Sequence, residues 1–233
     1  MRIFLSCFLF LCFSSLFSQE IVAPEIIPLV KVDSLYREDQ FYIAVSYNLL
    51  TNRPAGITQN KFSSGFKAGF LRDMPVNKSR TIAFATGIGF TYDNYNENMA
   101  ITGTAQNAVY NIIKTTDNSS KNKFSQLTVD VPIEFRWRNS TFQSHKFWRI
   151  YTGIKFSYLL HDRSVFTSEN SKVIIKGNDD FNKFQYGAYI ASGYNTINLY
   201  AYYGLNPLFQ SAMINGQKVD MRSVNLGLIF YIL

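Results

Sequence analysis

The chain offers few side chains that could carry out catalysis. Its two histidines are His145 and His161, and only His161 has an acidic neighbour, Asp162. A His–Asp pair could in principle activate a water molecule for hydrolysis. Adjacent residues of a strand point to opposite faces, however, so these two side chains would not act together in the strand that we expect here. We therefore predict that the protein is not an enzyme.

The same residues argue against a cofactor or metal site. The only cysteines, Cys7 and Cys12, fall in an N-terminal segment that we expect the mature chain to lack. Isolated histidines without cysteines do not supply the ligands of a zinc or haem site. The glycines of Gly87-Ile88-Gly89 lie in a predicted strand, where glycine makes room for a bulky neighbour rather than for a phosphate. No cofactor is predicted.

Charged side chains alternate with large apolar ones in several segments. The charged set at these positions is Lys67, Asp130, Glu134, Arg136, Arg149 and Lys155. In a small barrel they would face an interior just wide enough to be filled by side chains, where isolated charges are costly. We therefore predict a lumenal network that links the two carboxylates with Lys67, Arg136 and Lys155. Such a network is either a plug that holds a barrel shut or part of a gated path for solutes.

The elements that would position these charges are strands, because apolar residues recur with a period of two. From Leu127 to Trp137 every second side chain is large and apolar, while Asp130, Glu134 and Arg136 lie on the other face. Similar stripes give eight predicted strands: 41–49, 64–70, 82–92, 127–137, 148–160, 184–190, 197–203 and 224–232. Aromatic residues near the strand ends resemble the interfacial girdles of a membrane protein.

The connections between the predicted strands alternate in length. Long polar loops are expected from Asp93 to Lys123 and from Asp162 to Asn182, and short turns at Asp73 to Ser79, Asn139 to Lys146 and Asn195-Thr196. Short turns at one end and long loops at the other are typical of outer-membrane barrels. We predict an all-β, eight-stranded, antiparallel up-and-down transmembrane β-barrel. A secreted β-sandwich or a lipocalin-like barrel is the alternative.

Composition agrees with a barrel wall. The chain is 47% hydrophobic and 16% aromatic but only 17% charged, which excludes a disordered chain. A mean hydropathy of −0.05 leaves no room for several membrane-spanning helices. The formal net charge is +7, or +6 without Arg2. For an exported chain this basicity favours contact with anionic lipid head groups of the outer membrane, and no nucleic-acid partner is expected.

The N-terminus predicts export. One arginine, an apolar run and small residues before Gln19-Glu20 form the layout of a secretory signal peptide. We expect a signal peptide over residues 1–18, a periplasmic segment over 19–38 and an outer-membrane barrel over 39–233. The alternative to cleavage is a retained membrane anchor, for which the run is short of the ~20 residues needed to span.

The C-terminal segment resembles the signal that the barrel assembly machinery pairs with. Its four places are filled by Asn225, Gly227, Phe230 and Ile232. The departure is Leu233, where a terminal aromatic residue is common. The assembly machinery is therefore an expected partner.

The whole pattern resembles the PorT-like outer-membrane β-barrel proteins of Bacteroidota, within the porin family. The likeness rests on the signal peptide, the lead from Asp33 to Gln40, the glycine–aromatic strands, and the segments Phe62 to Phe66 and Gly69 to Pro75. It covers most of residues 35–233. It implies no catalytic residue, and it implies a component of type IX protein secretion or gliding that contacts other envelope proteins. The alternative is a small porin-like or adhesin-like barrel that acts alone.

Overall fold

The computed structural model describes residues 37–59, 61–113, 119–140, 147–169 and 171–232, and the side chains of 119–121 are not described. The predicted signal peptide, most of the predicted periplasmic segment, both cysteines, His145 and Leu233 lie outside these ranges. No helix of the described residues is long and apolar enough to cross a membrane.

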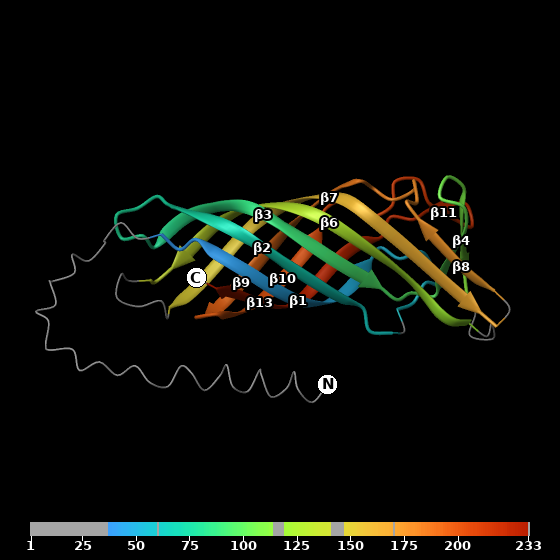
Figure 1. Cartoon of the computed structure of the whole chain (residues 1–233), viewed down its shortest axis with the longest axis horizontal. Coiled ribbons are helices and arrows are strands. Elements are labelled where there is room, and N and C mark those ends of the chain that lie inside the picture. The colour runs from blue at the N-terminus through green and yellow to red at the C-terminus, as the bar shows by residue number, and fades with distance from the viewer. Residues whose placement is uncertain (1–36, 60, 114–118, 141–146, 170, 233) are drawn as a thin grey trace, which may run out of the picture. The chain divides into compact units, whose positions relative to one another are not determined.

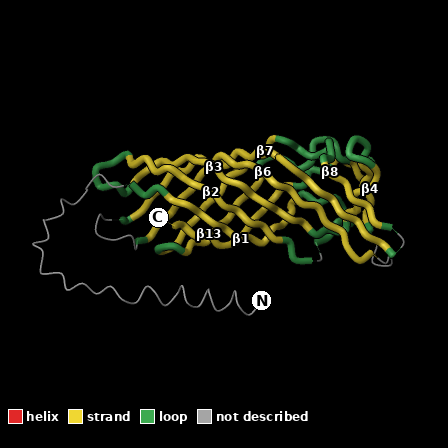
Figure 2. Tube along the Cα trace, viewed as in Figure 1, coloured by secondary structure: helices red, strands yellow, loops and turns green. Residues whose placement is uncertain are grey.

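Eight long antiparallel strands form a closed wall (Figures 1 and 2). They are β1 (Gln40–Thr51), β2 (Ser64–Pro75), β3 (Ile82–Tyr95), β6 (Ser119–Arg138), β7 (Trp148–Ser168), β9 (Phe184–Tyr194), β10 (Ile197–Gly204) and β13 (Arg222–Ile232). Sequential neighbours pair around the wall. The ring is complete because β13 pairs with β1 and joins the last strand to the first. The prediction of an eight-stranded antiparallel barrel is confirmed.

The wall has an apolar outside and a mixed inside. On β1, Phe41 and Ile43 are 62% and 50% exposed, whereas Tyr42 and Ala44 between them are 7% and 0% exposed. The same alternation of exposed apolar and buried residues follows the other seven strands. A sandwich would bury its apolar stripes between two sheets. Here the stripes face outward, as they do where a barrel meets lipid, so the sandwich alternative is wrong.

Glycine makes the narrow interior possible. Tyr42 lies opposite Gly69 on β2, and Gly69 lies opposite Gly89 on β3, so the three form one row across the wall. A Cβ atom at Gly69 would lie 2.7 Å from the Tyr42 ring. Because Gly69 and Gly89 have no side chain, they leave the space that the tyrosine ring fills. Glycine was expected to make room for a bulky neighbour in this way at Gly87-Ile88-Gly89.

The two ends of the barrel differ. At the turn end, short connections join β2 to β3, β6 to β7 and β9 to β10. At the loop end, β6 and β7 continue past the wall, and β8 (Lys172–Lys176) pairs with β7 there. Two further hairpins are β4 (Met99–Gly103) with β5 (Ala108–Ile112), and β11 (Met213–Ile214) with β12 (Gln217–Lys218).

The expected long polar loops are therefore wrong over much of their length. Strands occupy most of the described part of 93–123 and 162–182, because these segments bury apolar side chains of their own. We call this buried cluster and the segments that form it the loop-end cap. Its core is Leu50, Ile57, Tyr95, Met99, Ile101, Tyr110, Phe124, Leu159, Ile175, Phe181, Leu208, Phe209, Ala212, Ile214, Val219 and Met221. Phe181 and Phe209 stack with ring centroids 4.6 Å apart.

Candidate functional site: the charged lumen and the loop-end cap

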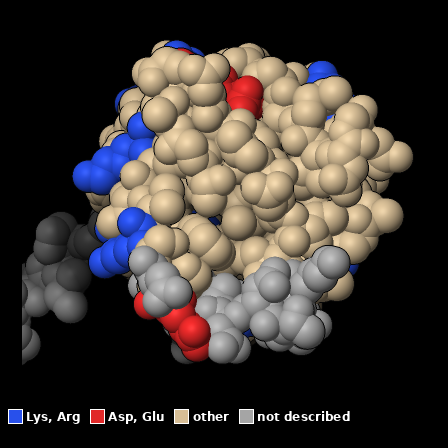
Figure 3. Space-filling model, turned by 90° about the vertical axis from the view of Figure 1, so that its right-hand side faces the viewer, with Lys and Arg blue, Asp and Glu red and all other residues tan. Residues whose placement is uncertain are grey.

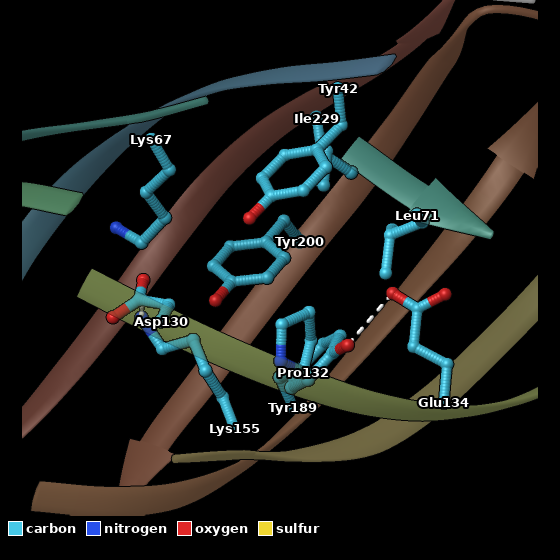
Figure 4. Close-up of a pocket in the computed structure, with 10 residues that line it drawn as sticks. All are labelled: Tyr42, Lys67, Leu71, Asp130, Pro132, Glu134, Lys155, Tyr189, Tyr200 and Ile229. Carbon is cyan, nitrogen blue, oxygen red and sulfur yellow. Dashed lines mark hydrogen bonds and ion pairs between the residues drawn. The ribbon is translucent and has the colours of Figure 1, made fainter. Parts of the chain in front are cut away.

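The middle of the lumen is built around Asp130 on β6. Its carboxylate accepts from Lys155 Nζ at 3.0 Å, from Thr91 Oγ1 at 2.5 Å and from Thr128 Oγ1 at 2.8 Å. Lys155 also lies 4.8 Å from the centroid of the Tyr202 ring. Asp130 and Lys155 are 1% and 7% exposed, and Figure 4 shows them close together at one side of the cavity. The structure thus places this predicted pair in direct contact.

Lys67 has a different partner from the ones predicted. Its Nζ lies 3.4 Å from Asp93 Oδ1 and donates to Ser46 Oγ at 3.0 Å. Asp93 also accepts from Asn48 Nδ2 at 2.9 Å. The apolar stripe that ends at Tyr92 predicts a loop from Asp93 onward, but β3 runs on to Tyr95 and carries Asp93 inward. Continuing the alternation from Gly89 and Thr91 by one step would have found it.

The turn end holds a second group of charges. Arg136 Nε lies 2.7 Å from Glu134 Oε2, and Tyr189 OH donates to the other oxygen of Glu134 at 2.7 Å. Asp73 accepts from Arg136 at 3.0 Å and from both terminal nitrogens of Arg138 at 2.8 and 2.7 Å. The bidentate contact is the strong geometry for an arginine and a carboxylate.

Asp73 and Arg138 also face the lumen, which the sequence pattern does not predict. Both were expected at or beyond strand ends, whereas β2 extends to Pro75 and β6 to Arg138. Both side chains are 0% exposed. Arg149, which was predicted for the network, lies against aromatic rings, with its guanidinium 4.5 Å from the Phe147 centroid and 5.4 Å from that of Tyr231. Such contacts are favourable for a cation near a ring face.

The described lumen is balanced in charge and nearly filled. Its charged residues are the buried cations Lys67, Arg136, Arg138, Arg149 and Lys155, the buried acids Glu38, Asp73, Asp130 and Glu134, and the half-buried Asp93. A cavity of about 20 Å3 lies between the two groups, lined by Tyr42, Lys67, Leu71, Asp130, Pro132, Glu134, Lys155, Tyr189, Tyr200 and Ile229 (Figure 4). That volume holds about one water molecule. A cavity of this size can hold water but has no room for a larger solute.

The residues considered for catalysis lie apart. His161 is exposed, whereas Asp162 is 4% exposed and accepts from the backbone N–H of Asn178 at 3.0 Å. The two side chains thus occupy opposite faces of β7. Among the described residues, no group of three or more His, Cys, Asp or Glu side chains could hold a metal ion.

The predicted assembly signal lies on β13, at the seam with β1. Asn225 is fully buried and donates to Asn48 Oδ1 at 2.5 Å, while Gly227 pairs with Ser46. Phe230 and Ile232 lie on the outward face, where Ile232 is 46% exposed. The four residues therefore divide into two that face the lumen and two that face outward.

The loop-end cap contains one buried acid with an altered pKa. Glu97, between β3 and β4, is 5% exposed, and its carboxylate oxygens have no hydrogen-bond partner among the described residues. Burial raises the pKa of Glu97 from 4.5 to about 7, against the opposing effect of the Arg53 charge. Desolvation disfavours the charged carboxylate, so the neutral acid is the form that the folded cap prefers.

The chain matches one family model and has distant structural neighbours. A family model described as "Outer membrane protein beta-barrel domain" matches residues 17–210. Two crystal structures of Ail, the attachment invasion locus protein of Yersinia pestis, align at 11% identity with TM-scores of 0.40 and 0.36. The first is in complex with a heparin analogue and covers 84% of this chain and 99% of Ail. A mutant porin of Rh. blastica aligns at 7% identity and a TM-score of 0.22, over 84% of this chain and 100% of the porin. No curated protein matches the chain.

Replacing Asp73 by asparagine should destabilise the barrel strongly. The change leaves Arg136 and Arg138 buried without their shared carboxylate. We expect a loss of about 3–5 kcal/mol in the free energy of unfolding. The measurement is urea unfolding of vesicle-reconstituted protein, followed by tryptophan fluorescence.

Asp220→Asn is the matched control for Asp73→Asn. It breaks the exposed 3.5 Å ion pair with Arg222, which should cost less than about 1 kcal/mol. Equal effects of the two substitutions would contradict a role for Asp73 in holding the turn end together.

Glu97 should make the stability of the cap depend on pH. Because its folded pKa of about 7 exceeds the ordinary 4.5, its contribution is complete below 4.5 and is lost as the pH rises through 7. The free energy of unfolding should fall between about pH 5 and pH 8 in the wild type. Glu97→Gln, which mimics the neutral acid, should remove this part of the slope. An unchanged slope in that variant would show that Glu97 titrates normally.

Proposed function

Since the chain belongs to the outer membrane protein beta-barrel domain family, we propose that it is a non-enzymatic envelope component that uses its loop end to contact protein partners. The protein is an outer-membrane β-barrel. Outer-membrane barrels have short turns on the periplasmic side and longer loops outside the cell. By this rule the loop-end cap is the part presented to the exterior.

The filled lumen is the observation that carries this proposal. Charged side chains of the same strand and of neighbouring strands meet in buried ion pairs, and the cavity beside them has a volume of only about 20 Å3. The loop-end cap adds a second layer, in which Phe124, Phe181 and Phe209 pack on one another. A barrel closed in this way is better suited to holding a rigid surface in place than to passing solutes.

The composition of the exposed surface of the cap supports contact with a protein. Its described surface carries exposed apolar side chains on separate hairpins, among them Val109 on β5 and Met213 on β11, each 52% exposed. Figure 3 shows that the loop end is mostly uncharged, with Lys and Arg side chains mainly at its rim. Apolar residues in an uncharged face with a polar rim are the usual composition of a protein contact.

The process that this contact serves is proposed from the resemblance to PorT-like barrels. We propose the machinery of type IX protein secretion as the first partner to test, with gliding as a related role. The second candidate is a barrel that acts alone as an adhesin, which the folded cap would also suit. Co-purification in mild detergent separates the two, because a secretion component should retain its partners and an adhesin should purify alone.

The lumen should not conduct. In a planar lipid bilayer, the wild-type protein is expected to give no steady ionic current, because the charge network and the cap both cross the path. Single-channel recording checks this, with a known porin as the positive control. Porin-like conductance would show that the network is a gate, and the plug would have to be abandoned.

Partner contact should map to the cap. A photo-crosslinking residue placed at Val109 or Met213 in living cells is expected to capture a protein, whereas one at Lys78, exposed at the turn end, should not. Mass spectrometry of the captured band identifies the partner. A deletion strain that exports its cargo normally would remove the secretion role but leave the adhesin role. Capture from Lys78 alone would place the contact in the periplasm and contradict the proposed surface.

A further inference from the structure

Three strands extend the barrel wall beyond its loop-end rim. The last residue of β7 that pairs with β9 is Tyr158, yet β7 continues to Ser168. Over this extension β7 lies between β6 and β8, as Figure 1 shows, with Arg163 opposite both Ser125 and Lys176. The outward face of the wall therefore continues past the rim as a three-stranded sheet.

The outward face of this extension is basic. Its alternating positions place Arg163 and Lys176 directly opposite each other, both exposed, while Ser164 and Ile175 beside them point inward and are buried. Lys172 is exposed on the same face of β8, and Lys123 is half-buried on the same face of β6. We call Lys123, Arg163, Lys172 and Lys176 the basic face.

The basic face lacks counter-charges. Among its described positions there is no Asp or Glu, and Glu169 belongs to the turn at the far tip of the β7–β8 hairpin. Like charges directly opposite on paired strands are destabilising. Elsewhere at the loop end, the half-buried Arg222 has the nearby carboxylate of Asp220 at 3.5 Å. The Arg163–Lys176 pair thus lowers stability and has no compensating contact in the described part of the chain. We infer that an external anion supplies the compensating contact.

The position of the basic face indicates which anion that is. Immediately below it on the same outward surface are Tyr158, Leu160 and Phe184, each 51–54% exposed. These are the last large apolar side chains of the eight-stranded wall on this side, at the level where aromatic residues meet the membrane interface, and beyond them Ile174 is exposed between Lys172 and Lys176. From Tyr158 to Arg163 the strand advances by five residues, or roughly 17 Å along its tilted axis. Arg163 therefore lies beyond the apolar belt, on the side of the outer head groups.

We propose that the basic face binds the phosphate groups of anionic lipids in the outer leaflet of the outer membrane. Arginine and lysine are the side chains that bind phosphate, arginine with bidentate geometry. Arg163 and Lys176 form the centre of the site, and Lys123 and Lys172 flank it. The inference rests on the proposed membrane orientation, with the loop end outside, but not on the identity of any protein partner.

The test is lipid binding by the full-length protein, folded in neutral detergent. Native mass spectrometry gives the Kd for diphosphorylated lipid A and for the same glycolipid with its phosphates removed. The wild type should bind the phosphorylated form more tightly. Arg163→Gln/Lys176→Gln should weaken that binding by about 30-fold, since each basic residue near an anionic surface contributes roughly a factor of five. The loss should be smaller at high salt.

The control is Arg72→Gln/Lys78→Gln, which removes the same charge from exposed positions at the turn end. It should leave the Kd for the diphosphorylated lipid unchanged, and Arg163→Lys should retain most of the affinity. All variants are first shown to be folded by their heat-dependent mobility in gels. An unchanged Kd in the Arg163 and Lys176 double variant, equal losses in both double variants, or equal binding of the dephosphorylated lipid would overturn the proposal. Cross-linking at the cap and bilayer conductance are measured independently of lipid binding. Failure of the proposed function can therefore be distinguished from failure of the lipid site.

Discussion

The structure depends on one constraint: eight strands that close into a ring leave an interior that side chains must fill. Lipid surrounds the wall, so a charge in this interior can be stabilised only by other side chains that face the lumen. The chain meets the constraint with Asp130 against Lys155 at 3.0 Å, and with Asp73 between Arg136 and Arg138. Glycines complement the larger groups, as Gly69 and Gly89 do for Tyr42. Breaking one buried pair would leave an uncompensated charge, so the network is coupled to the closure of the barrel itself.

The two ends of the barrel are closed by different interactions. At the turn end, a carboxylate shared by two arginines and arginine–ring contacts occupy the interior. At the loop end, strands that overrun the wall fold over it and bury an apolar cluster around Phe181 and Phe209. The protein therefore has a polar core within the membrane and an apolar core outside it, the reverse of the usual order for a soluble domain. The cap can keep a fixed shape because it has this core of its own, and a fixed shape is what a contact surface requires.

The outer surface has its own division. An apolar belt serves the lipid tails, and the basic face lies directly beyond it on β6, β7 and β8. The uncharged centre of the loop end is a different surface again. Lipid and protein partners would thus meet separate parts of one extension, so the lipid contact could orient the cap without obstructing it.

The sequence by itself determined the architecture, because a period of two over eight segments leaves a barrel wall as the arrangement that exposes every apolar stripe to lipid. It also predicted which of several charges face inward. Asp130, Glu134, Arg136 and Lys155 lie between the apolar residues of their strands, and alternate residues of a strand point to opposite faces. Only the tertiary structure decided the partners. Asp93 and Asp73 were read as loop residues, and the strands that carry them inward end beyond the last apolar residue of each stripe. The cap was likewise read as polar loops, because its buried residues are scattered among Asn, Ser and Thr without a period. The alternation of apolar and polar residues is a local property of the chain. The length of each strand, the partner of each lumenal charge and the core of the cap depend instead on contacts between segments far apart in sequence.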